Sequence, residues 1–215
     1  ALNWGAYASQ WKADYVPSDG IGRVNSGNAI LSRWRILEAK RLALPLIEAQ
    51  DGLTRYFYLR RNILRARIAV PDLESFYTLN THLSAFAEDD TTKKQVDLLV
   101  AVLEELDQAG ARFVAGGDLN LVPPGTVRLK DFPDDCDDAR FKGDDYTGKE
   151  TWLEELYALY SPAIPLHDYM ADNEPYFTFG GDEHIGWTRK LDHLFTNKQF
   201  EPGSGLVHQS EEQGG

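Results

Sequence analysis

The stretch Arg112-Phe113-Val114-Ala115-Gly116-Gly117-Asp118-Leu119-Asn120 decides how this chain folds. It is typical of a buried strand that ends in a carboxylate and a carboxamide. Side chains two residues apart on an extended backbone point the same way, so Asp118 and Asn120 can converge on one metal ion, phosphate or water. The preceding glycines allow another backbone or a ligand to approach closely. An Asp-x-Asn sequence after a strand also satisfies turn amides, and this motif alone leaves both interpretations open.

Two further apolar segments carry polar residues that suit a functional site. Residues 75–83 predict a strand with His82 near its end, where open α/β sheets gather functional groups. A lone histidine is more often a structural hydrogen-bonding group than a catalyst. Residues 187–195 predict a third strand, in which Asp192 lies between apolar residues. Because a buried carboxylate is costly unless it is paired, we expect Asp192 to have a partner.

An amphipathic helix is predicted over residues 92–109, between the His82 and Asp118 strands. Apolar residues follow helical spacing at Val96, Leu99, Val100, Leu103 and Leu106. Thr91 or Asp90 can cap its start, and Gly110 ends it. A strand, a helix and a further strand in this order usually form a right-handed crossover. Such a crossover would bring His82 and Asp118 to the same edge of the sheet.

Other segments support an α/β organisation. Residues 60–70 and 75–83 predict an antiparallel pair of strands, joined by a turn at Pro71-Asp72-Leu73-Glu74. Residues 151–160 predict a second helix, which Pro162 ends.

Four segments in sequence order resemble the endonuclease/exonuclease/phosphatase superfamily of metal-dependent phosphoesterases. They are Gly27-Asn28-Ala29-Ile30-Leu31-Ser32-Arg33, Leu79-Asn80-Thr81-His82-Leu83, Gly116-Gly117-Asp118-Leu119-Asn120 and Lys190-Leu191-Asp192-His193-Leu194-Phe195. The superfamily includes deoxyribonucleases, AP endonucleases, neutral sphingomyelinases and inositol polyphosphate 5-phosphatases. The resemblance implies an α/β fold, a two-sheet sandwich of mixed sheets flanked by helices. We expect one such domain over residues 1–215, with an acidic loop or insertion at about 122–150.

The resemblance also implies a role for each matching position. His82 resembles the histidine that contacts the scissile phosphate. Asp118 resembles the aspartate that orients or deprotonates the attacking water, and Asn120 its neighbour at a phosphate oxygen or a metal. Asp192 resembles an aspartate that orients a catalytic histidine. His193 follows at a position that varies in the family, and we interpret it as structural.

Metal and substrate contacts follow from the same resemblance. It implies Mg²⁺ or Mn²⁺ as the cofactor, with Asp118 and Asn120 as ligands. Asn28, Arg33 and Arg189 are candidates for binding the substrate. Arg33, Trp187 and Arg189 stay undecided between packing and substrate contact, and a salt bridge at the surface is a further alternative for Arg33.

Two motifs of the superfamily have no counterpart here. The metal-binding Glu of a Gln-Glu pair does not occur in residues 1–25, and no Ser-Asp-His motif follows Asp192. The chain begins with Ala1, and its only methionine is Met170. We therefore expect a trimmed sequence and predict that these 215 residues, if they are the whole protein, have little or no activity.

Composition limits the classes of partner. The formal net charge of -12 opposes nonspecific binding to DNA, although nuclease activity stays possible through cations and a local basic strip. A strip of this kind, or alternating arginines turned to solvent, is predicted at Arg55, Arg60, Arg61, Arg65 and Arg67. Seven aspartates lie in residues 131–145, which predict a surface loop. The single cysteine, Cys136, excludes an internal disulfide.

The sequence supports two main hypotheses of function. The first is a soluble, monomeric enzyme, cytoplasmic or secreted, that hydrolyses a phosphoester by activated water and a divalent metal. Its substrate would be a small molecule, a lipid headgroup or a nucleic acid. The second is a noncatalytic binding or regulatory domain that keeps the fold without the terminal motifs. A weaker third hypothesis is an unrelated nucleotide- or sugar-binding α/β protein.

Overall fold

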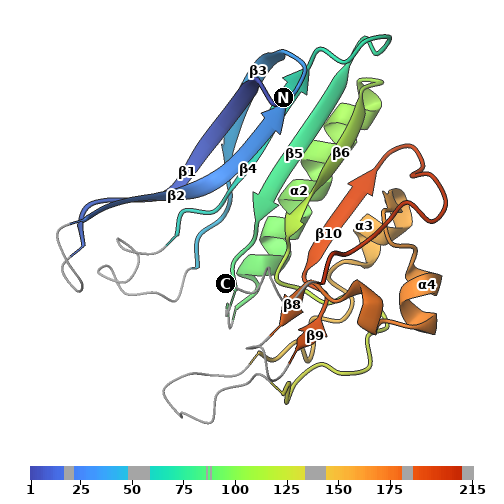
Figure 1. Ribbon diagram of the computed structural model, residues 1–215. Helices are drawn as coiled ribbons and strands as arrows, with labels where there is room; N and C mark the ends of the chain where they lie inside the picture. The colour runs from blue at the N-terminus through green and yellow to red at the C-terminus, as the bar shows by residue number, and fades with distance from the viewer. Residues whose placement is uncertain are drawn as a thin grey trace. The chain divides into compact units, whose positions relative to one another are not determined.

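The computed structural model describes residues 1–16, 22–47, 59–85, 87, 89–133, 144–180 and 186–209. Two compact units make up the chain, Ala1–Gly117 and Asp118–Gly215, and each is described by itself. Both units contain strands and helices, so the predicted mixed α/β class is confirmed (Figure 1). Arg55, most of the aspartate-rich stretch and Cys136 lie outside the described residues.

The first unit consists of a long hairpin, a sheet and a helix. The hairpin pairs β1 (Trp4–Val16) with β2 (Gly22–Ser32) in antiparallel register, and nothing in our sequence analysis predicted β1. The sheet has the strand order β3-β4-β5-β6 within this unit. Its strands are β3 (Ile36–Ala43), β4 (Asn62–Ile68), β5 (Phe76–His82) and β6 (Arg112–Asp118). The predicted antiparallel pairing of β4 with β5 is confirmed.

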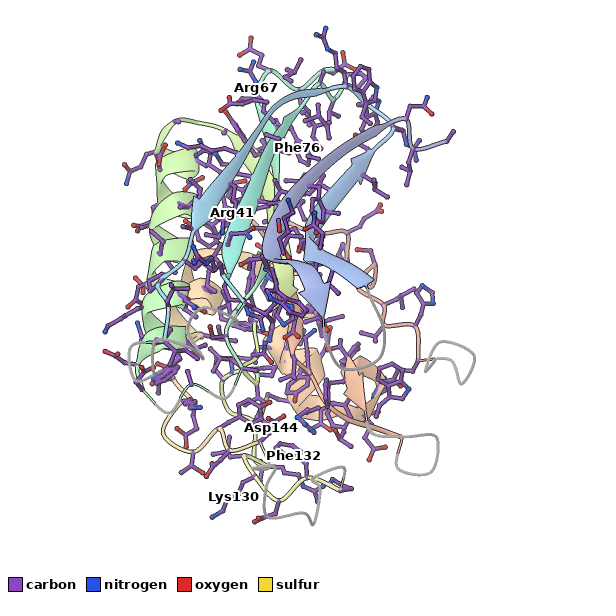
Figure 2. The ribbon with its side chains drawn as sticks, turned by 90° about the vertical axis from the view of Figure 1, so that its left-hand side faces the viewer. Arg41, Arg67, Phe76, Lys130, Phe132 and Asp144 are labelled. Atoms are coloured by element: carbon purple, nitrogen blue, oxygen red, sulfur yellow. The ribbon has the colours of Figure 1, made fainter. Side chains whose placement is uncertain are left out.

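Apolar side chains of the hairpin and of the sheet form a shared core. Ala8 and Ile30 of the hairpin pack with Leu64, Ala66 and Ile68 of β4. These β4 residues alternate along the strand, as expected when one face of a strand is covered. The hairpin is also held by the Arg41 side chain of β3, whose Nε donates to the Ser9 carbonyl at 3.2 Å (Figure 2).

The helix α2 (Thr91–Gln108) connects β5 to β6, as the sequence predicts. Its buried residues include all five apolar positions named from the helical spacing. At the start of the strands, the Arg112 amide donates to the Ser75 carbonyl at 2.9 Å. Near their ends, Gly117 lies against the Thr81 carbonyl. The strands β5 and β6 therefore run in parallel, which confirms the predicted crossover.

The arginines of β4 are not turned to solvent as a group. Arg61 is 4% exposed, and Arg65 and Arg67 are half-buried on the face opposite the hairpin core. Arg65 lies 3.6 Å from Glu105 of α2. The solvent-facing interpretation is therefore wrong for these positions. Arg65 pairs with the helix, and Arg61, just before β4, donates to the Gln10 side chain of β1. Among the described arginines of the predicted basic strip, only Arg60 is exposed.

The second unit contains short elements. They are α3 (Glu154–Leu159), β7 (Ser161–Pro162), α4 (Leu166–Ala171), a 3-10 turn η1 (Glu174–Tyr176), β8 (Phe179–Gly180), β9 (Trp187–Arg189) and β10 (Asp192–Thr196). Two antiparallel pairs form, β7 with β10 and β8 with β9. The predicted second helix is shorter than expected, because residues 151–153 form a turn before it.

The single strand predicted over residues 187–195 is wrong, because it is divided into β9 and β10. The break falls at Lys190 and Leu191. The backbone amides of Leu191 and Asp192 donate to the Thr178 hydroxyl, at 3.0 and 2.9 Å, instead of to a neighbouring strand. In the described part of the chain, no helix has the length and apolar character needed to cross a membrane.

Candidate functional site

A corner of backbone follows β6 and presents Asp118 and Asn120. Leu119 between them is fully buried, while both polar residues are half-buried. Asn120 has a φ of 50°, a left-handed conformation that asparagine tolerates better than most residues. Its amide donates to the Asp118 Oδ1 at 2.9 Å. The hydrogen bond of the turn, one of the two interpretations that the sequence left open, is therefore present.

Asp192 lies in the same region of the second unit. The Leu119 amide donates to the Leu191 carbonyl at 2.9 Å, which places the Asp118–Asn120 corner beside the start of β10. Asp192 itself is exposed, so the prediction that it is buried is wrong. Strand alternation explains the difference, because its neighbour His193 takes the inward position. The structure therefore places the backbone of the Asp118–Asn120 corner beside that of Leu191, the residue before Asp192.

His193 is a buried structural residue, in agreement with our interpretation of the sequence. It is 2% exposed. Its Nε2 lies 2.9 Å from the Leu121 carbonyl, to which it donates, and its Nδ1 lies 3.0 Å from the Tyr157 hydroxyl, from which it accepts. Burial, and then the charge of Lys190, lowers the pKa of His193 to about 3. The ring is therefore neutral in the folded protein at all but very acidic pH.

This buried histidine makes the stability of the protein depend on pH. Between the ordinary pKa of 6.5 and the folded pKa of about 3, the unfolded chain binds a proton that the folded chain does not. Stability is therefore greatest above pH 6.5 and falls as the pH drops through this window. The full effect is on the order of 5 kcal/mol. Urea unfolding at pH 7, 5.5 and 4.5 should show a steeper loss in the parent than in His193→Gln, and equal slopes would contradict this assignment.

His82 ends β5 in the first unit and is half-buried. Burial, and then the charge of Arg61, lowers its pKa to about 4. The imidazole is therefore neutral near pH 7, with one N–H to donate. The sequence analysis treated Arg61 as part of a surface cluster and missed its place next to His82. The available signal was its position at the start of β4, which pairs with the end of β5.

Asn28 belongs to a buried network of amides that joins three strands. Its Nδ2 donates to the Asn62 carbonyl at 2.9 Å. The Thr81 hydroxyl donates to the same carbonyl at 3.1 Å. Asn80 donates to the Ala29 carbonyl at 3.0 Å. The Asn28 side chain thus ties β2 to β4, and its expected contact with substrate remains a prediction.

The residues just before His82 and Asp118 are in contact within the first unit. Gly117 has a φ of 132°, and a Cβ added there would lie 2.0 Å from the Thr81 carbonyl oxygen. Only glycine allows this approach of the two backbones. The ends of β5 and β6 are therefore held side by side at the glycine that the sequence analysis singled out.

The two arginines predicted to bind substrate differ in their surroundings. Arg33 is exposed, with its guanidinium 5.3 Å from the centre of the Trp34 ring. Arg189 is 3% exposed and forms an ion pair with Asp144. The rings of Phe132 and Phe179 lie 4.3 and 4.4 Å from its guanidinium carbon. Figure 2 labels Phe132 and Asp144, which belong to this buried cluster. These contacts favour the packing interpretation of Arg189 over contact with substrate.

Charge is divided unevenly along the chain. Residues 1–117 contain 14 basic and 14 acidic residues, whereas residues 118–215 contain 8 basic and 20 acidic ones. The whole net charge of -12 therefore belongs to the second unit. The candidate residues Asp118, Asn120 and Asp192 lie in this acidic unit.

The donor atoms of the corner suit a hard cation. Mg²⁺ prefers carboxylate and carbonyl oxygens, which Asp118 and Asn120 supply, and it commonly keeps several waters when only one or two side chains bind it. Among the described residues, no three His, Cys, Asp or Glu side chains gather in a metal-binding group. The pair fits such an ion in donor type but forms only part of a coordination shell.

Comparison with known proteins identifies relatives of the whole chain. A family model described as the Endonuclease/Exonuclease/phosphatase family matches residues 1–213. No curated protein sequence shows a significant match. The catalytic domain of human nocturnin, solved with bound sulfate, has a similar structure at 15% identity, with a TM-score of 0.54 over 91% of this chain and 60% of that one.

Two bacterial structures are similar to the same extent. A mannosyl-6-phosphatase of Bacteroides thetaiotaomicron has 15% identity and a TM-score of 0.52 over 90% of this chain and 63% of that one. An endonuclease/exonuclease/phosphatase protein of Beutenbergia cavernae has 18% identity and a TM-score of 0.51 over 90% and 46%. The chain thus spans less than two thirds of the length of these structures. At 15–18% sequence identity, the similarity to these structures shows a shared fold and nothing more.

Proposed function

This chain belongs to the endonuclease/exonuclease/phosphatase family, and we propose that the protein hydrolyses a phosphoester by direct attack of water. The observation that carries the proposal is the polar corner after β6. There, Asp118 and Asn120 lie beside the start of β10 and Asp192. Membership of this family supports a shared catalytic role for Asp118, Asn120 and Asp192.

Asp118 orients the attacking water and accepts its proton. A carboxylate is suited to this task when it is positioned before the reaction starts. The Asn120 amide already fixes one oxygen of Asp118, which limits rotation of the carboxylate. The carboxamide of Asn120 then donates to a nonbridging oxygen of the phosphoryl group. Such preorganised donors stabilise charge that grows in the transition state.

His82 contributes a neutral N–H to a second nonbridging oxygen. The low pKa keeps the imidazole uncharged, so it acts as a hydrogen-bond donor and not as a fixed cation. The resemblance of residues 79–83 to the histidine motif of the family supports this role. Asp192 is exposed, and we propose that it orients a histidine outside the motifs found in this chain.

The proposed cofactor is Mg²⁺ or Mn²⁺, which Asp118 and Asn120 would hold. Such an ion neutralises charge on the phosphoryl group and on the leaving oxygen. The proposed substrate is a phosphodiester or a phosphomonoester of a small molecule, a lipid or a nucleic acid. Specificity within that range depends on the residues around the phosphate.

Hydrolysis assays test the proposed function. The product of the complete reading frame is incubated with bis-p-nitrophenyl phosphate or p-nitrophenyl phosphate, with added Mg²⁺, Mn²⁺ or EDTA. We expect turnover that EDTA removes and that either cation restores. The better of the two esters distinguishes a diesterase from a monoesterase. No turnover of either ester with either metal would contradict the proposal and favour a noncatalytic binding domain.

A further inference from the structure

A cavity of about 380 Å³ opens in the second unit, apart from the polar corner. Three segments line it: the loop from Thr126 to Pro133, the region from Tyr169 through η1 to Phe177, and β9 from Trp187 to Arg189. Its volume falls within the range of small-molecule sites, which begins at roughly 300 Å³. None of these residues has a role in the proposed reaction.

Aromatic side chains form one part of the cavity wall. Phe132, Tyr169, Phe177 and Trp187 contribute rings to it. Asp144 pairs with the cation of Arg189, and the rings of Phe132 and Phe179 lie 4.3 and 4.4 Å from its guanidinium carbon. Flat rings favour the face of another planar group.

Polar groups complete the lining. Arg128, Asn173 and Glu174 line the same cavity and are exposed to solvent. Together they offer hydrogen-bond donors of both the amide and the guanidinium type, and carboxylate and amide acceptors. A planar group that also carries ring nitrogens or carbonyls could use the aromatic wall and these polar groups at once.

The cavity lies close along the chain to the proposed reaction centre. Asp192 follows Arg189 by three positions, and an extended backbone of that length spans at most about 10 Å. Phe177 also precedes Thr178, whose hydroxyl accepts the amides of Leu191 and Asp192. The cavity is therefore near enough to hold one part of a molecule whose phosphoryl group lies at the corner.

We propose that this cavity binds the organic part of the substrate, and that this part is a planar aromatic or heterocyclic ring. The inference rests on the proposed phosphoester hydrolysis, because it takes the phosphate at the corner as given. Trp187 is the residue expected to stack on the ring. Stacking of a base on an aromatic side chain contributes about 1–3 kcal/mol, or roughly 5- to 150-fold in binding.

The first test measures binding without turnover. Adenosine 5′-monophosphate and ribose 5-phosphate share the sugar and the phosphate and differ only in the ring. With the product of the complete reading frame and EDTA present, we expect calorimetry to show at least about tenfold tighter binding of the nucleotide. Trp187→Ala should remove that difference without changing the binding of ribose 5-phosphate. Trp152→Ala is the matched control, because Trp152 belongs to the same unit and does not line the cavity.

A second arm uses turnover to distinguish an aryl ring from a base. The ratio of kcat/KM for p-nitrophenyl phosphate over methyl phosphate should fall in Trp187→Ala if the cavity takes simple aryl groups. It should stay constant if only a base is recognised.

Each outcome of these tests has a definite meaning. Equal binding of the two ligands by the parent, or equal effects of the two tryptophan substitutions, would overturn the inference even if the protein hydrolyses phosphoesters. Ring-dependent binding that requires Trp187, in a protein without turnover, would support the cavity and contradict the proposed function.

Discussion

Replacing Asp118 with Asn is expected to lower kcat for phosphoester hydrolysis about a thousandfold, within the range that a lost general base gives. The carboxamide cannot accept the proton of the attacking water. It can still accept the Asn120 amide through its oxygen, so the corner should keep its shape. Steady-state kinetics on bis-p-nitrophenyl phosphate and p-nitrophenyl phosphate provide the measurement.

The matched control for this substitution is Asp107→Asn. Asp107 is an exposed aspartate near the end of α2, so the same change of charge there should leave kcat within about twofold. Thermal unfolding of both variants should resemble that of the parent. A variant of Asp118 that is folded and fully active would show that another group activates the water.

Replacing Gly117 with Ala is expected to destabilise the protein by more than about 3 kcal/mol or to prevent folding. Two effects contribute to this loss of stability. A Cβ would lie 2.0 Å from the Thr81 carbonyl oxygen, and the φ of 132° disfavours any side chain. Because the obstacle is backbone and not a flexible side chain, the strands β5 and β6 would have to separate.

Gly110→Ala distinguishes these two causes. Gly110 also has a positive φ, of 71°, but no atom lies within 4 Å of a Cβ added there. Its substitution should therefore cost only the conformational part, about 1 kcal/mol. Urea unfolding of both variants gives the comparison, and similar losses would show that the close approach at Thr81 does not matter. If Gly117→Ala does not fold, a folded Gly110→Ala still completes the test.

The fold could be predicted from the sequence where periodicity was strong. The helix α2 and the strands β4, β5 and β6 agree with apolar spacing, and their boundaries differ by only a few residues. The hairpin strand β1 could not be predicted from our pattern reading, because its inward residues are small or polar, such as Ala8 and Gln10. The break between β9 and β10 depends on the Thr178 hydroxyl, which lies in a different segment.

In the candidate site, too, some features could be predicted from local sequence and others depend on tertiary contacts. The corner at Asp118 and Asn120 follows from local sequence, since an aspartate can accept the amide two residues on and asparagine tolerates the left-handed conformation. The burial of Arg61 and the exposure of Asp192 depend on which face of each strand is covered. A pattern of alternating residues is equally compatible with either face, so only the tertiary structure decides between them.

The unequal charge of the two units has a consequence for kinetics in solution. An anionic substrate that approaches residues 118–215 meets a net charge of -12, because the 20 acidic residues there exceed the 8 basic ones. Dissolved ions screen this repulsion over a Debye length of about 8 Å at physiological ionic strength. Added salt should therefore assist the encounter with a phosphoester, whereas it weakens the association of basic proteins with nucleic acids. The ionic strength of the solution, and not only the residues of the protein, thus sets the rate at which an anionic substrate reaches it.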